Sequence, residues 1–223
     1  PYARYLFILH LGGGYGGLEH RASCTLLSGP SAFHPRKRYE ELLERLAKTF
    51  GALRVGPALD DLDCGPLIRA SQLERVRGFL ADASRDRLPV AGQGAIAATA
   101  PASGYYVAPT LVRDVPPTSR LAREEVFGPV LAAMPFDDEA HAVKLANGTD
   151  FGLVAGVWTR DGGRQLRMAR AVRAGQVFVN SYGAGGGVEL PFGGFGHSGH
   201  GREKGFEALH GFTALKTVVL QHG

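Results

Sequence analysis

Apolar positions recur every three or four residues in two segments of the chain, at 39–50 and at 69–83. These positions are Tyr39, Leu42, Leu43, Leu46 and Phe50 in the first segment and Leu73, Val76, Phe79 and Leu80 in the second. This spacing predicts two amphipathic helices. A third helix is expected after Asp137-Asp138-Glu139, because acidic side chains favour a first helical turn. A fourth is expected over Gly163–Arg173, with Gly175 as its C-terminal stop.

Short apolar runs rich in β-branched and aromatic residues predict strands between these helices. The expected strands are Arg4–Leu11, Leu88–Ala91, Tyr106–Val112, Val130–Phe136, Leu153–Trp158 and Gln176–Asn180. Strands that alternate with helices at this spacing call for a parallel sheet with right-handed crossovers. The predicted fold class is therefore α/β, with helices flanking the sheet. A last run, Thr213–Leu220, alternates loosely and predicts one more strand.

A glycine-rich stretch runs from Asn180 to Gly205 between two of these ordered runs. It has too many glycines for a helix or strand, yet it also carries Pro, aromatic and charged positions that a plain linker does not need. Long loops held between ordered elements are usually functional. The stretch is therefore the first place to look for a site.

Composition and charge fit an ordinary globular protein. The 223 residues suffice for one large domain or two small ones. Lys and Arg outnumber Asp and Glu by 25 to 21, a net charge of only +4, and the basic residues are scattered among acids. A nucleic-acid partner would require a stripe of one sign, so none is expected.

Cysteine usage and hydropathy point to a cytoplasmic setting. Two cysteines, Cys24 and Cys64, cannot form a disulfide framework. The longest apolar run near the start, Tyr5–Leu11, is too short for a signal peptide and is interrupted by His10. No window approaches the ~20 apolar residues that a membrane helix needs, so no membrane association is expected.

Four motifs, in order, resemble signatures of the aldehyde dehydrogenase superfamily. They are Gly65-Pro66-Leu67-Ile68, Gly104–Leu111, Glu124-Glu125-Val126-Phe127-Gly128-Pro129-Val130, and Pro191-Phe192-Gly193-Gly194-Phe195 with Ser198-Gly199 and Gly201-Arg202-Glu203 after it. The resemblance covers about Phe33–Gly223 and corresponds to the C-terminal half of that family. It implies a Rossmann-like catalytic domain in which the strand Thr213–Leu220 pairs subunits into an oligomer.

The resemblance also implies a cofactor site for NAD or NADP. Glu125 matches the position that binds the nicotinamide ribose, and Phe127 the one that packs on the nicotinamide. A carboxylate can accept both ribose hydroxyls and an aromatic ring can stack on a flat one. A Gln and a Lys one turn apart approach the adenosine ribose in the family, and Gln72 and Arg75 stand there; an ordinary surface pair is the alternative. Phe192 resembles a wall of the aldehyde tunnel, which an aromatic side chain suits.

The nucleophile of such an enzyme is a cysteine thiolate that attacks the aldehyde carbonyl. Cys24 is the positional candidate, at about the family's distance before the helix of residues 39–50. The Gly-Gln pair that normally precedes the nucleophile is replaced by Ala22-Ser23. Cys24 as an ordinary small residue is the alternative, and Cys64 is interpreted as a turn residue.

A second resemblance covers only Tyr2–Leu27. Gly14–Ser23 is similar to a segment of the glycyl aminopeptidases, which are zinc exopeptidases. The chain contains no His-Glu-x-x-His, and His197 and His200 have no third ligand nearby in sequence, so no metal site is predicted. Gly12, Gly14 and Gly17 also satisfy G-x-G-x-x-G, but without the helix and acidic residue that a dinucleotide fingerprint needs.

These observations favour an atypical N-terminal segment, 1–32, followed by an aldehyde dehydrogenase-like domain, 33–223. The general base, the Asn oxyanion donor and the dinucleotide-binding domain belong to the family's other half. Since one oxyanion donor alone is worth ~10²–10³ in rate, we expect weak or no activity from this chain alone. The alternatives are a non-enzymatic assembly or regulatory subunit, binding a second copy or a full-length relative, and a zinc aminopeptidase remnant.

Overall fold

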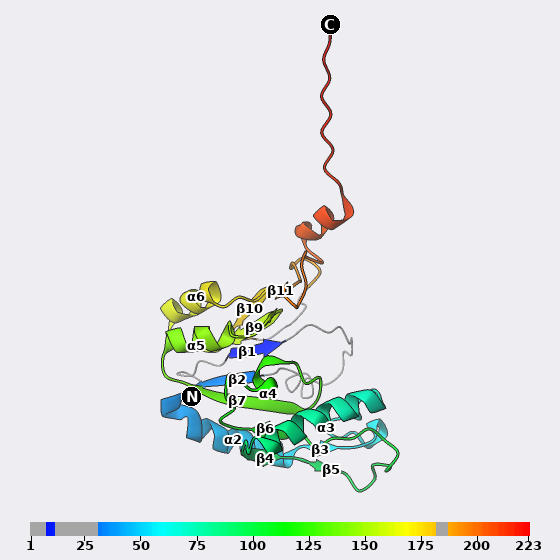
Figure 1. Cartoon of the computed structure of the whole chain (residues 1–223), viewed down its shortest axis with the longest axis vertical. Coiled ribbons are helices and arrows are strands. Elements are labelled where there is room, and N and C mark those ends of the chain that lie inside the picture. The colour runs from blue at the N-terminus through cyan, green and yellow to red at the C-terminus, as the bar shows by residue number, and fades with distance from the viewer. Residues whose placement is uncertain (1–7, 12–30, 182–186) are drawn as a thin grey trace.

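The computed structural model describes residues 8–11, 31–181 and 187–223, and its centre is a mixed seven-stranded sheet (Figure 1). The strand order is β10-β9-β1-β2-β7-β6-β4. The strands are β1 (Ile8–Leu11), β2 (Ser31–Pro35), β4 (Val90–Gln93), β6 (Thr110–Val112), β7 (Val130–Phe136), β9 (Val154–Val157) and β10 (Gln176–Val179). Two-residue strands form two small pairs, β3 (Arg54–Val55) with β5 (Ala95–Ile96) and β8 (Phe151–Gly152) with β11 (Phe195–Gly196).

Five strands of the large sheet run in the same direction. The pairs β10/β9, β2/β7 and β7/β6 are parallel, and β1 is antiparallel to both of its neighbours, β9 and β2. The edge strand β4 is antiparallel to β6. The predicted α/β class with a parallel sheet is confirmed, and β1 and β4 are antiparallel additions to its five parallel strands. The expected division at residue 32 stays a prediction, although β1 is hydrogen-bonded within this sheet.

Helices cover both faces of the sheet. They are α2 (Tyr39–Ala52), α3 (Ala70–Arg85), the short α4 (Arg120–Arg123), α5 (Glu139–Ala146) and α6 (Gly162–Ala171), with 3-10 turns η1 (Arg36–Arg38), η2 (Ala58–Asp60) and η3 (Phe206–Phe212). Figure 1 shows α5 and α6 beside the β9/β10 half of the sheet and α2 and α3 beside the β4/β6 half.

The alternation of side chains along β7 divides the core into two layers. Val130, Ala132 and Met134 pack with apolar residues of α3, α5 and α6, whereas Leu131 and Ala133 pack with those of α2. Because both faces of β7 are covered, the strand is an almost continuous apolar run, as expected for a central strand.

The helix boundaries follow the predicted signals. Asp138 caps α5 by accepting a hydrogen bond from the His141 N–H at 2.8 Å, and Asp161 caps α6 in the same way with the Arg164 N–H at 2.9 Å. The strand predicted over Tyr106–Val112 is only three residues long, because Pro109 has no N–H to offer the sheet.

The chain from η3 onward leaves the body of the molecule (Figure 1). The segment 213–223 is extended and pairs with no strand among the residues that the structure describes, so the strand predicted over Thr213–Leu220 is not formed with them. Among the described residues, no helix combines the length and the apolar character needed to cross a membrane.

Candidate active site

Two of the predicted motifs lie at the same edge of the sheet, where the parallel strands begin. The Glu124–Pro129 segment leads directly into the first residue of β7. The loop after β10 returns to the start of that strand, where Gln176 Nε2 donates to the carbonyl oxygen of Pro191 at 3.1 Å. The amino ends of the parallel strands are therefore the candidate site.

The Glu124–Pro129 segment is fixed to α3 at its start. The Arg120 guanidinium bonds Glu124, the residue that follows α4, and Asp82 on α3, both at 3.1 Å. It also lies 4.0 Å from the ring centroid of Phe79, a fully buried residue of α3. The cation–π contact and the ion pairs together hold α4 against α3.

Gln72 and Arg75, one turn apart on α3, bond to the backbone of the same segment. Gln72 Nε2 donates to the carbonyl oxygens of Val126 at 2.9 Å and Phe127 at 2.6 Å. Arg75 Nη2 donates to the carbonyl oxygen of Glu125 at 2.5 Å. The two residues therefore are not an ordinary surface pair, and the contact of Gln72 with a cofactor stays a prediction.

The Glu125 side chain is buried, with 7% of its surface exposed. No hydrogen bond reaches its carboxyl group from the described part of the chain, and burial raises its pKa from 4.5 to about 8, against a small opposing effect of the Arg75 charge. A buried carboxyl without a partner is costly unless a ligand supplies one. Glu125 thus has the environment of a ligand-binding group.

Phe127 combines backbone strain with exposure. Its φ of 57° lies in the left-handed region that residues with a side chain rarely adopt, and its side chain is 41% exposed although it is aromatic. Strained residues of this kind persist where surrounding contacts impose them, and they cluster at functional sites. The ring is available for a flat ligand.

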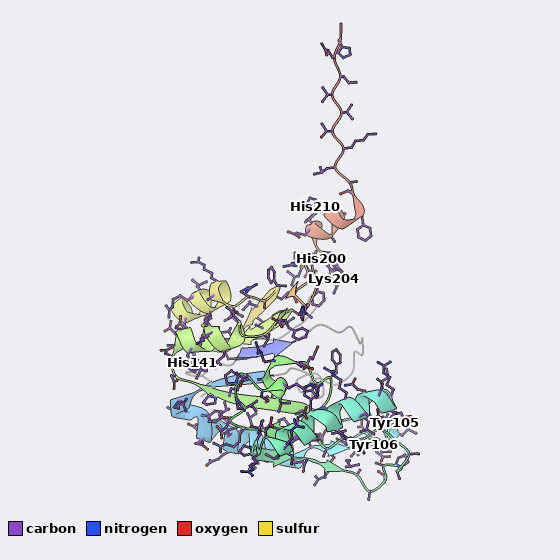
Figure 2. All side chains as sticks on the ribbon, in the orientation of Figure 1. Tyr105, Tyr106, His141, His200, Lys204 and His210 are labelled. Atoms are coloured by element: carbon purple, nitrogen blue, oxygen red, sulfur yellow. The ribbon has the colours of Figure 1, made fainter. Side chains whose placement is uncertain are left out.

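The glycine-rich loop is folded back on the sheet at its start. A Cβ at Gly175 would lie 1.6 Å from the carbonyl oxygen of Gly193, so only glycine permits this approach. Phe192 forms an antiparallel bridge with Glu203, and the Lys204 ammonium lies 5.7 Å from the centroid of the Phe192 ring. Figure 2 shows Lys204 and His200 at the base of the segment 206–223, which we call the C-terminal arm.

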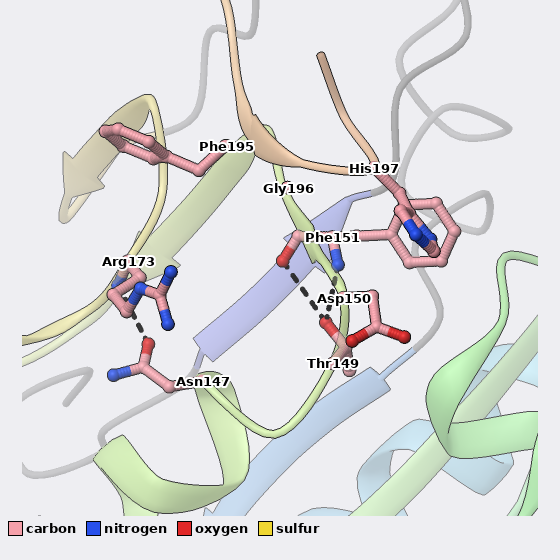
Figure 3. Close-up of a pocket in the computed structure, with 8 residues that line it drawn as sticks. All are labelled: Asn147, Thr149, Asp150, Phe151, Arg173, Phe195, Gly196 and His197. Atoms are coloured by element: carbon pink, nitrogen blue, oxygen red, sulfur yellow. Dashed lines mark hydrogen bonds between the residues drawn. The ribbon is translucent and has the colours of Figure 1, made fainter. Parts of the chain in front are cut away.

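A small cavity of about 240 Å³ lies beneath this loop. It is lined by Asn147, Thr149, Asp150, Phe151, Arg173, Phe195, Gly196 and His197 (Figure 3). The His197 ring packs edge-on against Phe151, with centroids 5.7 Å apart. The volume is below the range of sites for drug-sized ligands, so a dinucleotide does not fit here.

The predicted nucleophile, Cys24, lies outside the described residues. The strand ends that flank its segment are described: Leu11 pairs with the first residue of β9, and Ser31 is the first residue of β2. Both therefore lie at the same sheet edge as the Glu124–Pro129 segment and the glycine-rich loop. Over residues 8–11, 31–181 and 187–223, no three His, Cys, Asp or Glu side chains gather as a metal site would require.

A sequence profile described as "Aldehyde dehydrogenase family" matches residues 24–218, which is most of the chain. The chain belongs to the aldehyde dehydrogenase family.

Full-length members of the family are similar to this chain over less than half of their own length. Betaine aldehyde dehydrogenase 1 of Rhizobium meliloti is 36% identical over 214 residues, which are 96% of this chain and 44% of that protein. Betaine aldehyde dehydrogenase of Cereibacter sphaeroides is 40% identical over 199 residues, 88% of this chain and 40% of that protein.

Solved structures of aldehyde dehydrogenases share the fold. A protein from Burkholderia cenocepacia assigned to this group is 67% identical, with a TM-score of 0.82 over 87% of this chain and 41% of that one. Mycobacterium tuberculosis aldehyde dehydrogenase, solved with NAD+, is 35% identical with a TM-score of 0.76 over 86% of this chain and 39% of that one.

Membership in the family confirms the resemblance to aldehyde dehydrogenases, whereas the domain bounds 33–223 stay a prediction. The match begins at Cys24 itself, and the comparisons give no support to the glycyl aminopeptidase resemblance of Tyr2–Leu27. The roles of Cys24, Glu125, Phe127, Gln72 and Phe192 stay predictions.

Proposed function

We propose that this chain supplies the catalytic and subunit-pairing half of an aldehyde dehydrogenase that oxidises an aldehyde to an acid with NAD or NADP. The observation that supports this most strongly is the pair formed by Glu125 and Phe127. A buried carboxyl to which the described residues offer no hydrogen bond and an exposed aromatic ring in a strained conformation stand two residues apart. A ribose that binds the first places a flat ring near the second.

The chemistry assigned to the chain's own residues begins with Cys24. Its thiolate attacks the aldehyde carbon and forms a hemithioacetal. NAD or NADP held by Glu125 and Phe127 would supply the hydride acceptor that converts this adduct to a thioester on the Cys24 sulfur. Water then releases the acid and regenerates the thiol. Phe192 shapes the apolar approach for the aldehyde, while Glu125 and Phe127 orient the ribose and the ring.

The substrate class is a small aldehyde. Among the similar proteins are betaine aldehyde dehydrogenases, so betaine aldehyde belongs in any panel of substrates. NAD is the first cofactor to test, because the related Mycobacterium tuberculosis enzyme was solved with NAD+. NADP is the second.

A second candidate function is assembly without catalysis. It is favoured by the C-terminal arm, on which Leu215 is fully exposed and Phe212 and Val219 are 90% and 85% exposed. Contiguous exposed apolar surface of this kind marks an interaction site. In this alternative the chain binds a second copy or a full-length relative through the arm and forms no product itself.

The deciding experiment measures NADH absorbance with a panel of aldehydes for the wild-type chain, Cys24→Ala and Glu125→Gln. We expect slow turnover that Cys24→Ala abolishes and Glu125→Gln reduces through a higher KM for NAD. Turnover that survives Cys24→Ala would overturn the role of Cys24. The absence of turnover in all three, combined with stable complexes in sedimentation, would support assembly without catalysis.

A further inference from the structure

Two side chains of α3 donate hydrogen bonds to three consecutive backbone carbonyl oxygens, those of residues 125–127. Arg75 bonds the carbonyl oxygen of Glu125, and Gln72 bonds those of Val126 and Phe127, at distances of 2.5 to 2.9 Å. The partners are 50 to 55 residues apart in sequence. No sheet or helix ladder holds this segment, which lies between α4 and β7.

The segment needs such support because its conformation is unfavourable by itself. Phe127 has a φ of 57°, and the next residue, Gly128, lies so close to α3 that an added Cβ would be 2.4 Å from Val76 Cγ2. A strained backbone persists only where neighbouring contacts over-determine it. Here those contacts come from one face of α3: Gln72, Arg75 and Val76.

Both N–H groups of the Gln72 amide donate to these carbonyl oxygens, which leaves only its Oε1 for a ligand. The Arg75 guanidinium is likewise committed, since it also lies 3.8 Å from a Glu124 carboxylate oxygen and 5.0 Å from the centroid of the Phe79 ring. These geometries favour a structural task for the pair over direct recognition of a cofactor.

We propose that Gln72 and Arg75 are positioning residues: by donating to the carbonyls of Glu125, Val126 and Phe127, they hold this segment in the conformation that presents the Glu125 carboxyl and the Phe127 ring to the cofactor. The proposal rests on the proposed function for the identity of the ligand. The hydrogen bonds from Gln72 and Arg75 to this segment, which we call the clamp, are present in the chain without any ligand. The clamp and the proposed function can therefore be tested separately.

The clamp is tested by hydrogen exchange of the full chain without cofactor. Gln72→Met keeps the side-chain length but removes the donors, whereas Gln72→Lys keeps donors. Arg77→Met, at an exposed position of the same helix, is the matched control. We expect exchange of the amides of residues 125–130 to rise about tenfold in Gln72→Met, because the loss of two hydrogen bonds favours local opening. Gln72→Lys and Arg77→Met should stay within about twofold of wild type.

Exchange in Gln72→Met equal to wild type would overturn the clamp, and so would an equal rise in Gln72→Met and Gln72→Lys. If Gln72→Met does not fold, hydrogen exchange is compared between Arg75→Met and Arg77→Met instead, which tests the bond to the carbonyl oxygen of Glu125. Faster exchange in Arg75→Met alone supports the proposal, and no difference overturns it.

Cofactor binding is the second readout. Titration of the full chain with NAD, followed by calorimetry, should give an affinity about tenfold weaker for Gln72→Met than for Gln72→Lys. Wild-type affinity in a Gln72→Met chain that exchanges fast would overturn the positioning role. If the wild-type chain binds neither NAD nor NADP, the proposed function fails, while the exchange data still decide the clamp.

Discussion

Gly128 and Val76 are in such close contact that a Cβ on the glycine would lie 2.4 Å from Val76 Cγ2. The backbone before β7 therefore rests directly on α3. The same stretch of chain carries Glu125 and Phe127, so packing at Gly128 and presentation of the candidate site are coupled.

We expect Gly128→Ala to destabilise the fold by about 1–3 kcal/mol, because the new methyl group overpacks the contact with α3. Val76→Ala removes the clashing atoms, so the double variant should be more stable than the sum of the two single changes predicts. Gly78→Ala is the matched control: it lies on α3 with no heavy atom within 4 Å of the added Cβ. It should stabilise by roughly 0.5–1 kcal/mol. Urea unfolding of the four variants measures these values, and strict additivity would contradict the contact.

The sequence predicted the helices and the motifs of this arrangement, but not its contacts between residues that are far apart along the chain. Helical spacing located α2 and α3 because their apolar stripes are buried locally, as Leu43 and Val76 show. The motifs located Glu125 and Phe127 by resemblance. The bond between Gln72 and the carbonyl of Phe127 joins residues 55 apart. Local propensity and periodicity carry no information about contacts between residues so far apart. The sequence therefore suggested that Gln72 contacts a cofactor or belongs to an ordinary surface pair.

The sheet shows the same limit. The alternation of strands and helices predicted four of the five strands that run in the same direction, β6, β7, β9 and β10, since each parallel pair needs a crossover. It missed the fifth, β2. It did not predict that β1 inserts antiparallel between β9 and β2, because the pairing of β1 with β9 joins residues more than a hundred positions apart. The general expectation that ligands bind beyond the carboxyl ends of parallel strands also points away from the motifs, which lie at the amino ends.

Glu125 should make stability depend on pH. Burial raises the pKa of Glu125 in the folded chain from its ordinary value of 4.5 to about 8, so the folded chain keeps a proton that the unfolded chain releases. A raised carboxyl pKa therefore lowers the free energy of unfolding as pH rises from about 4.5 to 8. At 1.36 kcal/mol per pKa unit, the contribution of Glu125 should fall by about 3 kcal/mol between pH 5 and pH 8.

Glu125→Gln isolates this effect, because glutamine has the same shape and does not titrate. We expect the difference in unfolding free energy between wild type and Glu125→Gln to change with pH in that window, with the variant gaining relative stability at pH 8. Urea unfolding at pH 5, 6, 7 and 8 provides the comparison. Parallel pH profiles for the two proteins would show that the carboxyl titrates normally.

The glycine-rich loop should depend on Gly175. A methyl group there would displace the Gly193 carbonyl from the start of β10 and break the bond from Gln176 Nε2 to the Pro191 carbonyl oxygen. We expect Gly175→Ala to cost about 1–3 kcal/mol of stability and to raise hydrogen exchange at Phe192. Gly51→Ala, where a Cβ meets nothing within 4 Å, is the control. An intact loop in a fully stable Gly175→Ala chain would disprove the contact.

The exposed arm leads to a prediction about association. Leu215 and Val219 are four residues apart in extended chain and therefore share a face, and neither is covered within the chain. If a second copy covers them, burial of each side chain contributes about 1.5–3 kcal/mol.

The double variant Leu215→Asp, Val219→Asp should then weaken self-association at least about hundredfold. Lys216→Glu changes the net charge by the same two units at a polar position and should have a much smaller effect. Sedimentation velocity from about 1 to 100 μM covers the range in which such an arm acts. A wild-type chain that stays monomeric throughout that range, or equal weakening in both variants, would rule out apolar burial of the arm as the cause of association.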